Sequence, residues 1–374
     1  QLDYYAFVVV TVDNCIFVSL IWHKMNLKII SYLFLFLAIG FLYSCKSAKL
    51  SDAEEKQRIG EYFEAAAIYR NVYTKTPPAK RDLRGYIAFR MAECNRLINN
   101  TPRATSAYMN ALRYKYPDSI VNLRLGVTGS EEAVKWKQSP TRYAVKRMDK
   151  FNSRRSEFSP MLYGEKYDQL YFASTRTPKG AGKDKEETNS AITGQRNNDF
   201  FLVKQDENGA WQAPVELEDE VNTEFDEGTP SFSKDGNTMY YTYCAQDPEG
   251  PRTSEIYISS RSSAKWGKGT RANIVKDSVT ALGHPSISPD GKYLYFVSDA
   301  VGGYGGKDLF RARVMGSDFG PMENLGPDIN TPGDEMFPYV RDSVTLYFAS
   351  DGHPGMGGLD IFKATLDSTG KWNV

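Results

Sequence analysis

After residue 150 the chain repeats a unit of about 50 residues in which short apolar segments alternate with polar turns. In two clear copies, residues 230–241 and 285–296, Pro-Ser-X-Ser (X apolar) leads into Lys-Asp-Gly or Pro-Asp-Gly and then into a tyrosine-rich run. Weaker copies lie at 160–172 and 338–348. Asp-Gly is typical of tight turns and aromatic residues favour strands, so each copy predicts two strands joined by a turn.

A third and a fourth strand are predicted in every unit. After each aromatic strand comes a loop, then an acidic residue followed by two apolar ones, and eleven or twelve positions later an aromatic residue. The acidic residues are Asp199, Glu255, Asp308 and Asp360, and the aromatic residues that follow them are Trp211, Trp266, Phe319 and Trp372.

Both faces of the aromatic strand are apolar, with Tyr293, Tyr295 and Val297 on one side and Leu294 and Phe296 on the other. A sheet with one wet face would alternate polar and apolar residues instead. Small repeated sheets that shield one another on both faces are the blades of a β-propeller, and sandwiches seldom repeat their sequence so literally. Residues 151–374 therefore predict a β-propeller of at least four blades.

Residues 45–150 predict helices, the first beginning at Ser51 with Glu54 three positions later. Two helix pairs combine small residues with an aromatic one and end at proline, a pattern that resembles tetratricopeptide repeats. The small residues are Ala65, Ala66, Ala67, Ala104 and Ala111, the aromatic ones are Tyr69 and Tyr108, and a partial third unit covers 119–125 and 130–137. The resemblance implies a concave peptide-binding surface, and a structural adaptor is the alternative. The fold class expected is α+β multidomain, with helical repeats followed by an all-β propeller.

Residues 25–45 have the order of a secretory signal: Met-Asn-Leu-Lys, an apolar stretch over 29–42, then Leu-Tyr-Ser-Cys. The last four residues resemble the lipobox of bacterial lipoproteins, which implies cleavage before Cys45 and lipid on its thiol and amino group. The alternative is a transmembrane helix, but the apolar run falls short of the roughly 20 residues that a span needs. Residues 1–24 precede a complete signal and are expected to be upstream sequence, with a second apolar span over 7–22 as the alternative.

Charge divides the chain into two parts. Residues 49–155 contain 22 Lys and Arg against 11 Asp and Glu, whereas residues 156–374 contain 21 against 33. Such parts are expected to be separate domains that have different partners or attract each other, although two solvated surfaces fit as well. No basic run is interleaved with aromatic residues, so nucleic acid is not an expected partner.

The residues that suggest chemistry are few. Cys94 and Cys244 lie in different predicted domains, so we expect free, buried thiols, and the non-equivalent His284 and His353 predict no metal site. No cofactor and no catalytic residue is expected, because neither a P-loop nor a Gly-x-Ser-x-Gly motif is present. The polar insertion at 176–198 is interpreted as a mobile loop or a partner contact.

Two glycine-rich loops are the remaining candidates for contacts. We expect their glycines to serve turns with positive φ, and we expect acids in and after the loops to cap turns or to contact a partner or cation. The acids are Asp299, Asp308, Asp351 and Asp360.

The twin loops at 298–310 and 350–362, together with the lipobox and the helical units, resemble OmpA-family lipoproteins of Bacteroidetes, including the PorE-type component of type IX secretion. Their Pro-Ser-X-Ser-Pro-Asp-Gly blades resemble TolB-type propellers. This resemblance implies a non-catalytic scaffold that is lipid-anchored in the outer membrane, faces the periplasm, and binds envelope proteins.

In that family a later OmpA-like domain holds peptidoglycan. This sequence departs from the pattern because it stops at Trp372-Asn373-Val374, in mid-repeat, so we expect a propeller that is C-terminally incomplete. The alternatives are a TolB-like or ligand-sensing propeller independent of secretion, and a hydrolase.

Overall fold

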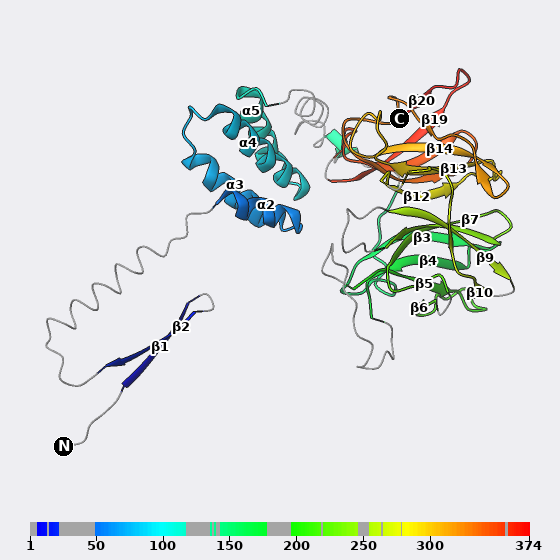
Figure 1. The fold of residues 1–374 in the computed structure, drawn as a ribbon, viewed down its shortest axis with the longest axis horizontal. Coiled ribbons are helices and arrows are strands. Elements are labelled where there is room, and N and C mark those ends of the chain that lie inside the picture. Colours follow the sequence, from blue (N-terminus) through cyan, green and yellow to red (C-terminus); the bar gives the residue numbers. More distant parts are fainter. Residues whose placement is uncertain are drawn as a thin grey trace.

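The computed structural model describes residues 6–12, 15–21, 49–116, 135–136, 138–139, 143–177, 196–217, 220–245, 254–262, 265–277, 279–355 and 358–374. Two structured regions dominate it, a group of helices and a series of small β-sheets (Figure 1). The predicted order of helices first and an all-β region second is confirmed. The signal segment, Cys45 and most of the partial third helical unit lie outside the described residues.

Four helices form the helical region: α2 (Leu50–Arg58), α3 (Tyr62–Lys75), α4 (Arg81–Leu97) and α5 (Thr101–Arg113). Small residues allow neighbouring helices to approach closely, and Tyr69 and Tyr108 fill the spaces that remain. The buried small residues are Ala53, Ala65, Ala66, Ala88, Ala92, Ala104, Ala107 and Ala111.

The predicted start of the first helix was wrong. The first helix is capped at Lys49, whose backbone N–H donates to Oδ2 of Asp52 at 3.2 Å, so Ser51 lies inside the helix. Helix α5 ends at Arg113, and Lys115 beyond it takes a left-handed conformation with φ of 56°. Ahead of the helices, β1 (Ala6–Val12) and β2 (Cys15–Ile21) pair as an antiparallel hairpin.

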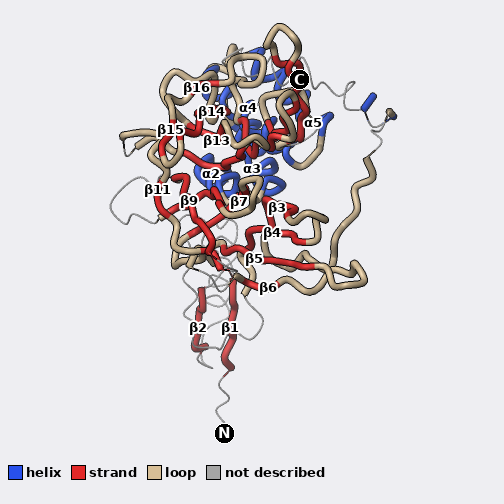
Figure 2. Tube along the Cα trace, turned by 90° about the vertical axis from the view of Figure 1, so that its right-hand side faces the viewer, coloured by secondary structure: helices blue, strands red, loops and turns tan. Residues whose placement is uncertain are grey.

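The strands after residue 150 form four antiparallel sheets, each made from consecutive strands (Figure 2). We call them blades I to IV. Blade I is β3 (Glu157–Tyr163), β4 (Gln169–Ser174), β5 (Asp199–Lys204) and β6 (Val215–Glu216). Blade II is β7 (Asp226–Phe232), β8 (Thr238–Cys244), β9 (Glu255–Ser262), β10 (Lys265–Trp266) and β11 (Thr270–Arg271). Blade III is β12 (Leu282–Ile287), β13 (Tyr293–Ser298), β14 (Asp308–Met315), β15 (Asp318–Phe319) and β16 (Glu323–Asn324). Blade IV is β17 (Glu335–Val340), β18 (Thr345–Ser350), β19 (Asp360–Leu366) and β20 (Trp372–Asn373).

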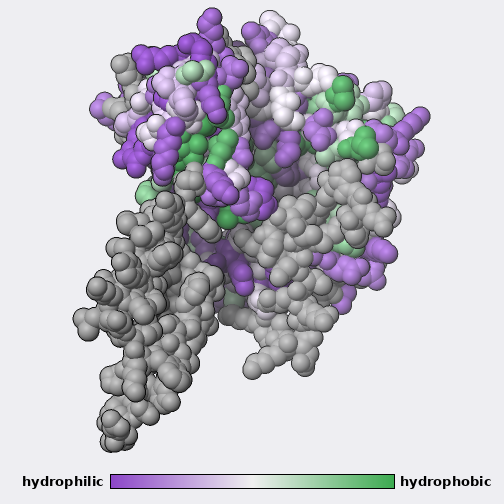
Figure 3. Space-filling model, turned by 60° about the vertical axis from the view of Figure 1, so that its left-hand side comes forward, coloured by the Kyte–Doolittle hydropathy of each residue, from purple (hydrophilic) through white to green (hydrophobic). Residues whose placement is uncertain are grey.

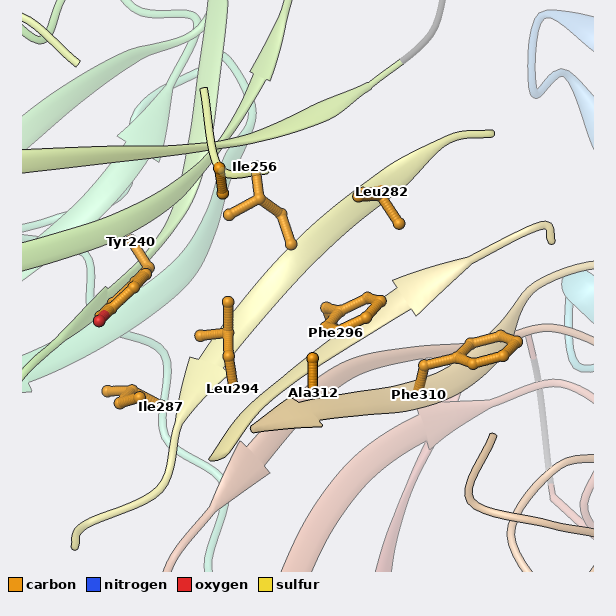
Figure 4. Close-up of a cluster of buried hydrophobic side chains, with 9 residues drawn as sticks. Tyr240, Ile256, Leu282, Ile287, Leu294, Phe296, Phe310 and Ala312 are labelled. Atoms are coloured by element: carbon orange, nitrogen blue, oxygen red, sulfur yellow. The ribbon is translucent and has the colours of Figure 1, made fainter. Parts of the chain in front are cut away.

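Each blade packs face to face on the next, as a propeller requires. Between blades II and III, Tyr240 and Ile256 meet Leu294, Phe296 and Phe310 in one buried cluster (Figure 4). Equivalent clusters fill the interfaces between blades I and II and between blades III and IV. The predicted propeller of at least four blades is therefore confirmed, with four blades among the described residues.

The Pro-Ser-X-Ser motif joins the blades at their first strands. In blade II the first serine, Ser231, accepts a hydrogen bond from the backbone N–H of Ile287 in blade III at 3.1 Å. Ser286 of blade III accepts in the same way from Val340 of blade IV, also at 3.1 Å. The second serine of the motif closes the Asp-Gly turn: Ser288 donates to Asp290 at 2.7 Å, and Gly291 takes a φ of +71° that favours glycine.

Every first strand also bulges at the residue before its proline. These residues take a left-handed backbone with φ between 50° and 52°, which is uncommon for residues that carry a side chain. They interrupt the pairing register with the second strand at the same place in all four blades. The four residues are Ser159, Thr229, His284 and Phe337.

Candidate functional site

An apolar groove lies beside blade I, in contact with both blade I and blade IV. Its volume is about 670 Å³, within the range typical of ligand sites. The groove is lined mainly by apolar and aromatic residues, and its polar lining comes chiefly from Asn152 and Glu157. The lining residues are Met148, Phe151, Asn152, Glu157, Phe158, Pro160, Met161, Leu162, Tyr167, Leu170, Phe172, Trp211 and Tyr339.

One difference between the sequences of the blades lies at the groove. Ser231 and Ser286, which join one blade to the next, pair in register with Tyr240 and Tyr295. The equivalent position of blade IV, opposite Tyr347, is Tyr339. Its bulky ring cannot make the short serine bridge; it is 49% exposed and lines the groove. We name this the interblade groove.

The far face of blade IV is also uncovered. The second residue of the third strand is apolar in blades I to III, where it is Phe200, Ile256 and Leu309. Each of these side chains is buried against the following blade. The same position of blade IV holds Ile361, which is 83% exposed. Among the described residues no further sheet follows blade IV on this side.

The four aspartates singled out in the sequence make ordered contacts. Asp308 accepts hydrogen bonds from the backbone N–H groups of Tyr304 at 2.6 Å and Gly305 at 3.1 Å, and from the Asn324 side chain at 2.8 Å. Asp299 accepts from the N–H of Ala281 at 2.9 Å.

The two in the second loop differ. Asp351 accepts from the N–H of Asp334 at 2.9 Å and also faces α4. Asp360 is half-buried at the start of β19, against Gly355. The structure does not bring the four acids into one cluster: no group of three or more His, Cys, Asp or Glu in the described residues could hold a metal.

The glycines of the twin loops serve a purpose other than the one predicted. Among those described, only Gly302 has a positive φ, at +92°. A side chain at Gly305 would collide with the backbone of Thr331 and Gly333, and one at Gly352 would collide with Thr331. These glycines allow loops of neighbouring blades to approach closely, so the expectation of turns with positive φ was largely wrong.

The helical region is joined to blade IV at Arg96. Its guanidinium lies 3.2 Å from the carboxylate of Glu93 on the same helix and 3.7 Å from that of Asp351, and it donates to the carbonyl of Gly358 at 3.5 Å. Tyr108 on α5 donates to Glu93. The side chain of Arg96 is only 11% exposed, so this is a buried junction between two oppositely charged parts of the chain. The pair of Arg96 with Asp351 joins the positively charged helical region to the negatively charged blades, as expected if the two parts attract each other.

Glutamates lie at or next to the start of the first strand in three blades; Glu227 and Glu335 are buried, and Glu157 is half-buried. Glu157 is paired with Arg176 at 2.9 Å, and although burial acts to raise its pKa, hydrogen bonds from Ser153 and the nearby Arg176 lower it. Burial raises the pKa of Glu227 to about 8 and that of Glu335 to about 7, against hydrogen bonds from neighbouring Ser and Thr. These two carboxyl groups are therefore partly or mainly protonated at neutral pH.

His284, for which the sequence predicts no metal site, lies at the bulge in the first strand of blade III and contacts blade IV. Its ring stacks on Phe337 with centroids 4.0 Å apart, and Nδ1 accepts from the N–H of Phe337 at 3.3 Å. Burial, with a smaller effect of Lys307, lowers the pKa of His284 to about 3, so the ring is neutral. The position before the repeated proline recurs in every blade, and this repetition was the feature of the sequence that could have indicated it.

The other sequence predictions have mixed outcomes. Neither Cys94 nor Cys244 forms a disulfide; Cys94 is buried, whereas Cys244 is only half-buried. Most of the 176–198 insertion lies outside the described residues; at its ends Arg176 and Arg196 pair with Glu157 and Asp199. Within the part of the chain that the structure describes, no helix is long and apolar enough to span a membrane.

Known proteins offer only a distant likeness. No family model and no curated protein matches the sequence. Among solved structures, TolB from Acinetobacter baumannii is 21% identical, with a TM-score of 0.35, over 60% of this chain and 44% of that one. A TolB-like protein from Agrobacterium tumefaciens is 19% identical, with a TM-score of 0.34, over 60% and 82%. An α-L-arabinofuranosidase from Lactobacillus brevis is 12% identical, with a TM-score of 0.37, over 58% and 75%. The chain spans less than half of the Acinetobacter protein, and these values are too low to carry the function of any of the three over to this chain.

Proposed function

We propose that this chain is a non-catalytic scaffold that binds other proteins of the cell envelope. The observation that carries the proposal is the interblade groove, an apolar surface between blade I and Tyr339 of blade IV. Exposed contiguous apolar surface on a folded domain favours a site for partners. The buried Arg96 junction supports the proposal, because it couples the helical region to the blade beside that surface.

The anchor and the location belong to the same proposal. The lipobox at 42–45 favours lipid on Cys45, and hence an outer-membrane protein facing the periplasm. The resemblance of the tetratricopeptide-like units and glycine-loop blades to PorE-type proteins favours a complex of the type IX secretion kind. The link to peptidoglycan would then run through an OmpA-like domain of a longer protein.

Photo-crosslinking in the native envelope tests the scaffold role. A photoreactive amino acid replaces Leu162 or Tyr339, both of which line the interblade groove, and the matched control replaces Val301, which is fully exposed on a loop. We expect a defined envelope protein to be captured at the groove positions and not at Val301. Equal capture at all three positions, or none, would contradict the proposal. Loss of membrane association in Cys45→Ser, measured by fractionation, tests the anchor separately.

A small-molecule sensor is the second candidate, because the groove volume of about 670 Å³ also suits such a ligand. Thermal shift against a metabolite library distinguishes the two, since only a sensor is stabilised by a small molecule. Hydrolysis is the third possibility, and turnover of chromogenic peptide or glycoside substrates by the purified chain would overturn the non-catalytic assignment.

A further inference from the structure

We propose that a groove in the helical region binds an acidic segment of a partner protein, with an apolar side chain of that segment seated in the groove. This inference deepens the proposed scaffold function and rests on it. The groove lies where α3 and α5 flank the second half of α4, and we name it the helical groove. Residues that line it include Phe63, Ala66, Arg70, Met91, Arg103 and Ala107.

The shape of the helical groove favours a peptide side chain over a free small molecule. Its volume is about 230 Å³, below the roughly 300 to 1,000 Å³ of small-molecule sites. Ala66 and Ala107 are buried and small, so they form a floor over which the flanking helices leave room. Phe63 stands at the edge with 69% of its surface exposed, which is unusual for a phenylalanine without a partner to cover it.

Charge identifies the occupant. Arg70 and Arg103 both line the helical groove and are both exposed. Within the described residues neither has a carboxylate partner, whereas Arg58 and Arg96 on neighbouring helices are paired with Glu55 and Glu93. Two unneutralised guanidinium groups at the edges of an apolar floor match a segment in which carboxylates flank an apolar residue.

The helical region around the groove also carries a net positive charge. Residues 49–116 contain 13 Lys and Arg against seven Asp and Glu. A positive surface of this kind attracts acidic polypeptides and speeds their association. Arg96 and Leu97, which contact blade IV, do not line the helical groove. Figure 3, which brings the helix-bearing side forward, shows apolar residues exposed among hydrophilic ones.

Fluorescence anisotropy with the purified full chain tests the inference. The probe is a labelled peptide of about twelve residues that alternates Glu with Leu; one comparison peptide has Lys in place of Glu and another has Ser in place of Leu. We expect only the Glu-Leu peptide to bind well, and its binding to weaken with added salt because exposed charges are screened. Charge reversal in the double variant Arg70→Glu/Arg103→Glu should weaken binding by about tenfold or more.

A matched control keeps the test specific. The double variant Lys75→Glu/Lys80→Glu makes the same change in net charge at exposed positions outside the groove, and it should bind the Glu-Leu peptide within about twofold of the wild type. Circular dichroism confirms that both double variants fold. Equal losses in the two double variants, equal binding of the Lys-Leu peptide, or no binding by the wild type would each overturn the inference. Partner capture at the interblade groove is measured independently, so the scaffold role can stand when this inference fails.

Discussion

Leu309 of blade III and Ile361 of blade IV occupy the same position in consecutive blades, yet Leu309 is completely buried and Ile361 is 83% exposed. Leu309 is covered by Leu346 and Phe348 of the following blade. No described sheet provides such a cover for Ile361. The repeat thus places the same kind of side chain in two environments, and the difference can be measured.

Replacing each of these residues with alanine should have different consequences for stability. Leu309→Ala leaves a cavity between two blades and should lower the free energy of unfolding by about 2–5 kcal/mol. Ile361→Ala removes an exposed side chain and should change it by less than about 0.5 kcal/mol. Urea denaturation followed by tryptophan fluorescence measures both. Similar losses would show that Ile361 is covered in the purified protein, for example by self-association.

The serine bridges between first strands give a second prediction. Ser286→Ala removes the acceptor for the buried N–H of Val340 and should cost about 1–3 kcal/mol, because that donor would have no other partner. Ser260→Ala is the control, since Ser260 is exposed on a strand of blade II and should tolerate the change. Thermal unfolding of the two variants gives the comparison. A loss no larger than that of the control would mean that water replaces the serine.

The sequence was sufficient to predict the blades because their pattern is local. Alternating apolar residues, Asp-Gly turns and a period near 50 are properties of each unit by itself, and 293–298 is a strand for the reason that the pattern indicates. What surrounds a blade is not a local property. Ile361 and Leu309 have nearly the same neighbours in sequence, so their opposite exposure could only come from the arrangement of the sheets.

The sequence indicated that the acidic residues would cap turns, but it did not indicate which distant residues they would contact. Asp308 caps a turn, as its position after a glycine-rich loop suggests. Asp351 also faces Arg96, which lies about 250 residues earlier in the chain. Nothing in the residues around either of them indicates that pairing, because it depends on how the helices seat on blade IV. The interblade groove was missed for the same reason, although Tyr339 stands in place of a repeated serine.

The buried Glu227 predicts a specific pH dependence of stability. Its pKa in the folded protein, about 8, lies above the ordinary value of 4.5, so the folded state holds a proton that the unfolded state releases between these values. Stability from this group is therefore fully present below about pH 4.5 and is lost as pH rises through 8. Glu227→Gln cannot ionise, so the variant should gain stability relative to the wild type between pH 6 and pH 9. His284 stays neutral over this range and does not contribute.

Thermal unfolding of wild type and Glu227→Gln, measured in parallel from pH 6 to pH 9, checks this prediction. The difference between the two melting temperatures should grow from pH 6 to about pH 8 and level off above it. Glu157→Gln is the contrasting variant, because the pKa of Glu157 is lowered and its carboxylate is paired with Arg176. A constant difference for Glu227→Gln would show that its carboxyl group titrates normally.

The Arg96 junction should hold the helical region in place. Arg96→Ala leaves Glu93 buried without its cation and Asp351 without its partner from α4, and breaking a buried pair in this way typically costs about 3–5 kcal/mol. Asp351→Asn should cost less, because Arg96 keeps Glu93 and the carbonyl of Gly358. Arg58→Ala is the control: its pair with Glu55 is exposed on both sides, so its loss is expected to change stability little.

A second measurement separates seating of the helices from folding of the helices themselves. Two spin labels, one on Lys75 of α3 and one on Lys363 of β19, report the distance distribution between the helical region and blade IV. If Arg96 holds the junction, the distribution should be narrow in the wild type, broad in Arg96→Ala and narrow in Arg58→Ala, while circular dichroism shows the same helix content in all three. A distribution that stays narrow in Arg96→Ala would assign the seating to the apolar contact of Leu97 with the second glycine-rich loop at Gly358 instead of to the buried charge.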